Sequence, residues 1–223
     1  MFKIDDVDLL AYEKDLYKKG ITLICGTDGV GRGPLCGPVV AAACILPVNY
    51  KVEGLTDSKR LTEKKREKLY DILINDKNVH YAVGIVDEKR IDEINIREAS
   101  KEAMIQAINK LDVKPEHVLI DAMNLDIDIP QTAIIHGDAL SLSIAAASVI
   151  AKVTRDNMMV ELDKIYPEYG FGKHKGYPTK DHIEAVKKYG VLDFYRFTFS
   201  PISEIINEEH KRVIKWKSYL LID

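Results

Sequence analysis

Cysteine is scarce in this chain, whose 223 residues include only Cys25, Cys36 and Cys44. Three scattered thiols cannot build a disulfide framework, and no two of them have the Cys-x-x-Cys spacing of a metal site. We expect them to be small buried hydrophobic residues. Hydrophobic residues make up 46% of the chain, enough to bury one good core, so stability need not come from cross-links.

The sequence also lacks any apolar run long enough to span a bilayer. The N-terminus carries Asp5 and Asp6 where a secretory signal would have bases and an apolar block. We therefore expect a soluble cytoplasmic monomer with no membrane contact. The formal net charge of -3 does not exclude a polyanionic ligand, because local charge decides such binding.

The rest of the chain is organised around residues 21–38. A short apolar run, typical of a buried strand, leads to Asp28 and then breaks into glycines that flank Arg32. A simple turn and a nucleotide cradle are the two alternatives. The spacing fits neither the dinucleotide fingerprint nor the phosphate loop, because a third glycine and a glycine-lysine pair are missing.

No helix follows these glycines, since Pro34 and Pro38 precede a second apolar run, residues 38–46. The glycines therefore lie between two strands, where the backbone can come close to a ligand. Expected strands are 21–28, 38–46, 79–86, 117–121 and 132–135. Expected helices are 5–19, 61–73 capped by Thr62 or Ser58, 91–110, 140–162, 180–189 and 202–221. This order predicts a mixed sheet with helices packed on it, in the α/β class.

Three acids share one context, because Asp28, Asp121 and Asp138 each lie at or just beyond the end of a predicted strand. If these strands are neighbours, the acids meet at one edge of the sheet. Two carboxylates about 4 Å apart repel by about 4 kcal/mol at an effective dielectric constant of 20, so a cluster implies protonation or a bound cation. Ligands that are all oxygen indicate Mg²⁺ or Mn²⁺.

Each acid alone has an ordinary structural explanation, and Asp138 in particular could cap the helix that starts near Leu140. All three together favour a site. Asp156 is excluded from it, because a helix with 1.5 Å rise per residue would place it about 27 Å from Asp138. We expect Asp156 to pair with Lys152 or Arg155 instead.

Several segments, in this order along the chain, resemble the signature of the ribonuclease HII family. They are residues 21–38, Thr56–Leu61, Leu119–Asp121, Gly137–Ser148 and Lys175–Thr179. The chain departs from the family's pattern at one position, since the family has Asp-Glu at the end of the first strand and this chain has Asp28 followed by Gly29.

The resemblance implies a ribonuclease H-like mixed five-stranded sheet flanked by helices, with a catalytic domain of residues 1–200 and a C-terminal helical extension of residues 201–223 packed on it. It implies an endonuclease that hydrolyses the RNA strand of RNA·DNA hybrids and nicks DNA 5′ of embedded ribonucleotides by two-metal-ion hydrolysis. Asp28, Asp121 and Asp138 would be the catalytic metal ligands, for Mn²⁺ or Mg²⁺.

The resemblance also implies substrate contacts. Tyr177 would stack on the deoxyribose beside the junction. Considered without its neighbours, this residue could instead be an aromatic side chain that packs inside the loop. Ser58 and Lys59 would contact backbone phosphates. The loop that reads the ribose 2′-hydroxyl would be Gly31, Arg32 and Gly33.

Gly29 removes one ligand and one negative charge, so we expect weaker metal binding and a turnover lower by orders of magnitude. Two other hypotheses remain open. One is an inactive protein that binds RNA–DNA junctions, and the other is a small-molecule phosphohydrolase that uses the same acids.

Overall fold

The computed structural model describes residues 8–55 and 61–207. Its centre is a five-stranded mixed sheet in the order β3-β2-β1-β4-β5. The strands are β1 (Ile24–Val30), β2 (Val39–Ile45), β3 (His80–Val86), β4 (His117–Asp121) and β5 (Gln131–Ile134). The helices are α1 (Ala11–Tyr17), α2 (Glu63–Asn75), α3 (Glu88–Asn109), α4 (Leu142–Ile165), α5 (Phe171–His174) and α6 (Lys180–Tyr189), with 3-10 turns η2 (Gly137–Ala139) and η3 (Pro167–Tyr169).

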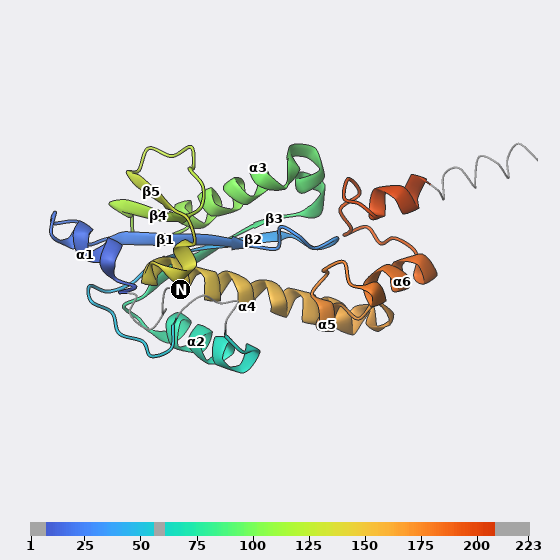
Figure 1. Ribbon diagram of the computed structural model, residues 1–223, viewed down its shortest axis with the longest axis horizontal. Coiled ribbons are helices and arrows are strands. Elements are labelled where there is room, and N and C mark those ends of the chain that lie inside the picture. Colours follow the sequence, from blue (N-terminus) through green and yellow to red (C-terminus); the bar gives the residue numbers. More distant parts are fainter. Residues whose placement is uncertain (1–7, 56–60, 208–223) are drawn as a thin grey trace, which may run out of the picture.

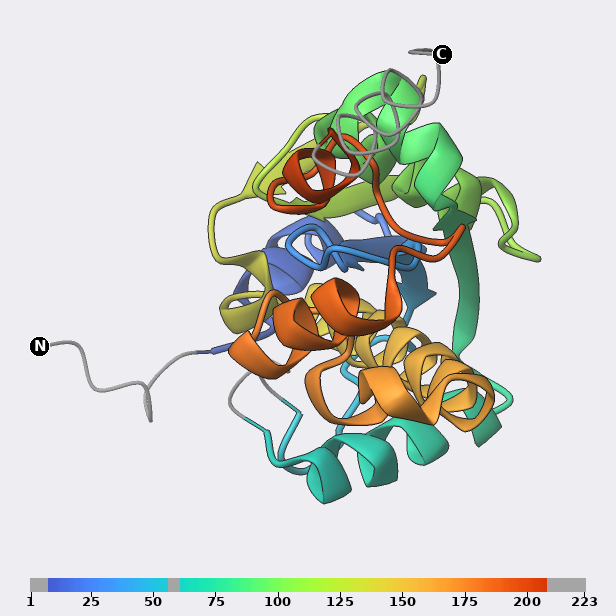
Figure 2. The same ribbon diagram turned by 90° about the vertical axis from the view of Figure 1, so that its right-hand side faces the viewer.

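Helices cover both faces of the sheet. Figure 1 shows α3 on one face and α2 with α4 on the other, and Figure 2 shows the same layers after a quarter turn. Strand β2, between β3 and β1, is buried along its whole length, which explains why its sequence is a continuous apolar run rather than an alternating one. The predicted mixed sheet with flanking helices is confirmed.

The pairing of the strands brings distant parts of the sequence together. β1 and β2 are antiparallel, as are β2 and β3, whereas β1 pairs with β4 and β4 with β5 in parallel. Parallel neighbours end at the same edge of the sheet, so the C-terminal ends of β1, β4 and β5 lie together.

Most helix and strand boundaries lie within a few residues of the predicted ones, and side-chain caps explain two of the helix starts. Thr62 caps α2 by accepting a hydrogen bond from the Lys65 N–H, whereas the other predicted cap, Ser58, lies outside the described residues. Helix α3 begins before the predicted residue 91, because the Asp87 carboxylate accepts from the Arg90 N–H. Strand β1 runs on through Val30, which pairs with Val40.

Small residues let the helices approach the sheet closely. A Cβ atom at Gly26 would collide with the backbone of Ser143 in α4, and one at Gly84 would collide with the Ala103 carbonyl in α3. The alanines 145–147 of α4 are fully buried against the sheet. Contact between α4 and β1 therefore depends on the lack of a side chain at Gly26.

The segment that follows α6 packs on a hydrophobic cluster of its own. Ile202 is buried together with Leu35, Phe171 and Tyr195, and residues 202–207 are helical. The remainder of the predicted helix 202–221 lies outside the described residues, and the division at residue 200 stays a prediction. The three cysteines are buried free thiols, as predicted. Over residues 8–55 and 61–207, no helix is long and apolar enough to cross a membrane.

We predict that Gly26→Ala lowers the free energy of unfolding by about 3 kcal/mol, because the methyl group must push α4 away from β1. Gly29→Ala is the matched control on the same strand. A Cβ atom there meets its nearest neighbour, the Met104 Cε, at 3.4 Å, so a change of only about 0.5 kcal/mol is expected. Urea unfolding of both variants is the measurement, and equal losses would contradict this account.

Candidate active site

Two carboxylates come together because their strands are parallel neighbours. Thr27 of β1 pairs with Ile120 of β4, and the next residue on each strand is an aspartate. Asp28 and Asp121 both line a pocket of about 260 Å³. Asp138 lies in η2, directly after β5, and is 4% exposed. The N–H of its neighbour Gly137 donates to Asp121 Oδ1 at 2.7 Å, which ties the third acid to the second.

The electrostatics of Asp28 show that the three acids are within range of one another. Its side chain is almost buried, and burial together with the charge of Asp121 raises the pKa of Asp28 to about 7, with a smaller contribution from Asp138. Hydrogen bonds from Ser148 and from the Gly29 N–H oppose this shift. At neutral pH the Asp28 carboxyl group is therefore divided between its charged and its protonated form.

The arrangement is looser than the predicted cation nest. Within the residues that the structure describes, no three His, Cys, Asp or Glu side chains are placed so that they could hold one metal ion together. Like-charge repulsion, which raises the pKa of Asp28, opposes a closer approach. The donor set itself fits Mn²⁺ or Mg²⁺, because it consists of carboxylate oxygens whose mutual repulsion a divalent cation would relieve.

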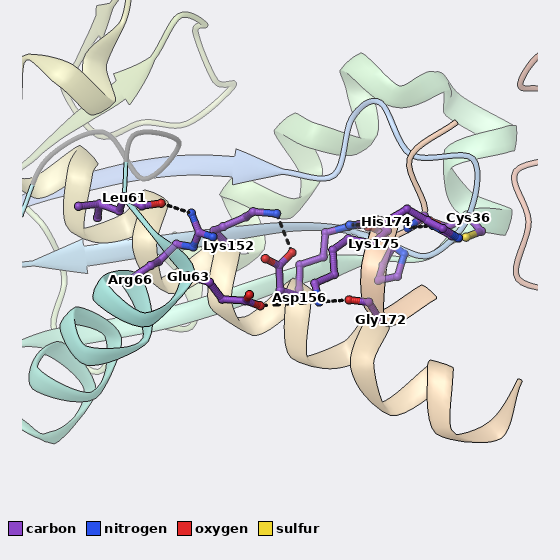
Figure 3. A network of polar contacts seen from close by, with 12 residues as sticks. Cys36, Leu61, Glu63, Arg66, Lys152, Asp156, Gly172, His174 and Lys175 are labelled. Atoms are coloured by element: carbon purple, nitrogen blue, oxygen red, sulfur yellow. Dashed lines mark hydrogen bonds and ion pairs between the residues drawn. The ribbon is translucent and has the colours of Figure 1, made fainter. Parts of the chain in front are cut away.

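Asp156 is not part of this group. Its Oδ1 is 2.7 Å from Lys152 Nζ, one turn earlier in α4. Figure 3 shows the two side chains pointing toward each other. The predicted pairing of Asp156 with a neighbouring base is confirmed. Lys152 also lines the pocket of Asp28, a position that sequence reasoning missed. The sequence predicted either Lys152 or Arg155 as the partner of Asp156 and could not show that the lysine also faces the pocket.

Asp138 does not cap α4. The cap is Ser141, whose hydroxyl accepts from the Ile144 N–H at 3.2 Å. A second residue that sequence reasoning missed, the fully buried Glu13 of α1, accepts from the Ser141 hydroxyl and the Ser143 N–H at 2.7 and 3.0 Å. A carboxylate is favourable at a helix N-terminus, so Glu13 holds the start of α4 three residues beyond Asp138.

Two buried arginines donate hydrogen bonds to the backbone of the glycine-rich loop that connects β1 to β2. Arg196 donates to the carbonyl groups of Gly31, Arg32, Pro34 and Gly37 at distances from 2.6 to 3.2 Å. Arg155 donates to the carbonyl groups of Cys36, Pro38 and Lys175. Burial and the charge of Arg155 lower the pKa of Arg196 to about 10, which leaves it charged at neutral pH.

The loop needs glycine at Gly31, whose φ is 92° and whose missing Cβ would collide with the Arg155 side chain. Gly33 lies against Tyr177, because a Cβ atom there would be 3.4 Å from Tyr177 Cε1. The Tyr177 side chain is 42% exposed and lines the same pocket as the loop. Of the predicted substrate contacts, the structure thus brings Gly31, Arg32, Gly33 and Tyr177 to the pocket of Asp28 and Asp121, whereas Ser58 and Lys59 lie outside the described residues.

A family model described as Ribonuclease HII matches residues 25–201. The chain belongs to the ribonuclease HII family. It is 56% identical to the ribonuclease HII of Bacillus cytotoxicus over 203 residues, which cover 91% of this chain and 78% of that protein. It is also 56% identical to the ribonuclease HII of Acetivibrio thermocellus over 195 residues, covering 87% of this chain and 76% of the relative.

Solved structures agree on the fold. The ribonuclease H2 of Pyrococcus horikoshii OT3 superposes with a TM-score of 0.72 at 31% identity, over 84% of this chain and 99% of that one. A ribonuclease HIII solved with Mn²⁺ has a TM-score of 0.58 at 16% identity, over 83% of this chain and 69% of that one, and supports the fold alone. The predicted ribonuclease H-like fold is confirmed, and membership of the ribonuclease HII family makes the chain a hydrolase and an endoribonuclease.

We predict that Asp28→Asn stabilises the metal-free protein at alkaline pH. The pKa of Asp28 is raised from its ordinary 3.8 to about 7, so the native state holds this proton more tightly than the unfolded state. Stability is therefore lost as the pH rises from about 4 to about 7, by at most on the order of 4 kcal/mol. The asparagine amide does not ionise, so the variant does not lose this stability as the pH rises.

Urea unfolding in EDTA measures the difference between Asp28→Asn and the parent protein across this pH range. The advantage of the variant should grow with pH and level off above about 7. A difference that does not change with pH would show that Asp28 does not titrate as described.

Proposed function

We propose that the protein hydrolyses the RNA strand of RNA·DNA hybrids and nicks DNA 5′ of embedded ribonucleotides. The observation that carries this proposal is the shared pocket. Asp28 and Asp121 line it together with Gly31, Gly33 and Tyr177, so acids suited to phosphodiester hydrolysis lie beside a loop suited to contact a sugar. Family membership supports the same substrate class.

The loop provides the selectivity for RNA in this proposal. A protein distinguishes RNA from DNA through the 2′-hydroxyl, which both donates and accepts hydrogen bonds. Glycine at 31 and 33 leaves the backbone around Arg32 open to a ribose. Tyr177 lies across Gly33 with its ring partly exposed, where it can stack on the next sugar.

The acids provide the catalysis. Asp28, Asp121 and Asp138 would hold Mn²⁺ or Mg²⁺, and two such ions supply an activated water and stabilisation of the leaving 3′ oxygen. Asp28 must release its proton to act as a ligand, and its pKa of about 7 makes this step dependent on pH near neutrality. Lys152 adds a cationic side chain to the wall of the pocket, complementary to a phosphate.

Gly29 limits this activity in our proposal. The family has a glutamate at this position, and glycine supplies neither its charge nor its ligand atoms. The backbone would accept the glutamate, because the nearest atom to a Cβ at Gly29 is Met104 Cε at 3.4 Å. An intact sugar loop beside an incomplete acid set also supports the second candidate function, a junction-binding protein that does not cut.

We predict that Gly29→Glu raises the nicking rate on a duplex with one embedded ribonucleotide by roughly two orders of magnitude, the scale of one charged group at a reacting centre. Gly29→Gln is the matched control, because it adds the same volume without the charge. The assay uses a labelled duplex and Mn²⁺. Equal rates for Gly29→Glu and the parent would refute the role given to Gly29.

The parent protein in the same assay separates the candidate functions. Cleavage supports the nuclease, and a metal-dependent gel shift without cleavage supports the junction binder. Failure to bind any duplex contradicts both and favours a small-molecule phosphohydrolase.

We predict that Tyr177→Ala weakens the preference for a single embedded ribonucleotide over continuous RNA about tenfold, because one aromatic stack is lost. Tyr177→Phe keeps the ring and should keep the preference. Competition between the two labelled substrates is the measurement. An unchanged preference in Tyr177→Ala would count against the stacking role.

A further inference from the structure

Two buried imidazoles lie directly under the segment that carries Tyr177. His174 ends α5 and His182 belongs to α6, and their rings stack with centroids 4.1 Å apart and 16° between the planes. The Phe171 ring meets both of them edge-on. His174 is 8% exposed and His182 is not exposed at all, so neither can take part in binding directly.

The partners of His174 fix its protonation. Its Nε2 is 2.8 Å from the Tyr169 carbonyl oxygen, which can only accept a hydrogen bond. The Gly176 N–H donates to its Nδ1 at 3.1 Å, and an amide can only donate. The ring is therefore neutral, with its proton on Nε2. A second proton, on Nδ1, would face the Gly176 N–H donor and break that hydrogen bond.

His182 has the opposite tautomer. Its Nδ1 donates to the Tyr177 carbonyl oxygen at 2.9 Å. Its Nε2 is 2.7 Å from the Tyr195 hydroxyl, which donates to it when the ring is neutral. One imidazole thus binds the amide of Gly176, the residue before Tyr177, and the other binds the carbonyl group of Tyr177 itself.

We propose that His174 and His182 are a positioning pair for Tyr177, two neutral imidazoles of opposite tautomer that hold its backbone so that its ring stays on Gly33. The pair follows from the hydrogen bonds and the stacking alone. Its consequence for ribonucleotide preference rests on the function proposed above for Tyr177.

The charges around the pair do not overturn this assignment. Asp163 of α4 and Asp181 of α6 favour a charged His174, but Asp181 is paired with Lys173 at 3.0 Å, and Lys173 itself opposes the charge. Burial lowers the pKa of His174 and, with a contribution from His174, that of His182 from its ordinary 6.5 to about 4. Because the native state binds these protons more weakly than the unfolded state, the free energy of unfolding falls as the pH drops below about 6.5, whereas the native His182 ring stays neutral until the pH approaches about 4.

The first test needs no nucleic acid. In the full chain labelled with ¹⁵N-histidine, two imidazoles should show opposite neutral tautomers at neutral pH, and His182, with its proton on Nδ1, should stay neutral at about pH 5.5, one unit below the ordinary imidazole pKa. Tyr195→Phe removes the donor to Nε2 and should shift the ¹⁵N resonance of that nitrogen. A charged His182 ring at about pH 5.5 in the parent, two identical tautomers, or an unshifted resonance in Tyr195→Phe would overturn the pair.

The second test couples the pair to Tyr177. The parent and its variants are compared in binding a fluorescent duplex with one embedded ribonucleotide and the same duplex with a continuous RNA strand. His182→Ala should reduce the preference about as much as Tyr177→Ala, roughly tenfold, and the double variant should lose no more than either single one. His182→Asn, which can donate where Nδ1 does, should restore the preference.

Losses that multiply in the double variant would overturn the positioning role, as would a His182→Asn variant no better than His182→Ala. If Tyr177→Ala itself leaves the preference unchanged, the function proposed for Tyr177 fails, and the tautomer measurement still decides the pair.

Discussion

The parallel pairing of β1 with β4 is the interaction on which the site depends. It places Asp28 beside Asp121 although 92 intervening residues separate them in the chain. The backbone hydrogen bonds of the sheet, together with the helices packed on both faces, offset the electrostatic repulsion that raises the pKa of Asp28. The fold therefore keeps together acids that would separate in a flexible chain. A bound cation would relieve the repulsion between them.

Much of this architecture could be predicted because its signals are local. β4 and α6 have the predicted bounds, since each is a strongly patterned segment with clear breakers at its ends. The end of β1 was set too early, because glycine at position 29 suggests the end of a strand while pairing with Ala41 continues it. In the site, Lys152 and Arg155 were both predicted as partners of Asp156 because they are near it on one helix, and the ion pair is with Lys152.

The rest of the site could not be predicted, because it is made of contacts between distant residues. Glu13 meets Ser141 across 128 positions, and Arg196 meets Gly31 across 165. Neither residue lies in a motif or a periodic pattern that marks it. The sequence also did not predict that the acids are too loosely arranged to hold one metal ion together. The order of the strands determines which carboxylates are neighbours, but it does not determine the distances between them, and their mutual repulsion opposes a closer approach.

The hydrogen bonds from Arg196 to the glycine-rich loop limit when that loop can become fixed during synthesis. The loop lies within the first 40 residues, whereas the guanidinium group that binds four of its carbonyl groups belongs to residue 196 of 223. During synthesis the loop leaves the ribosome long before that group exists. The hydrogen bonds from Arg196 that fix the carbonyl groups of the loop can therefore form only after at least 159 further residues have been added to the growing chain.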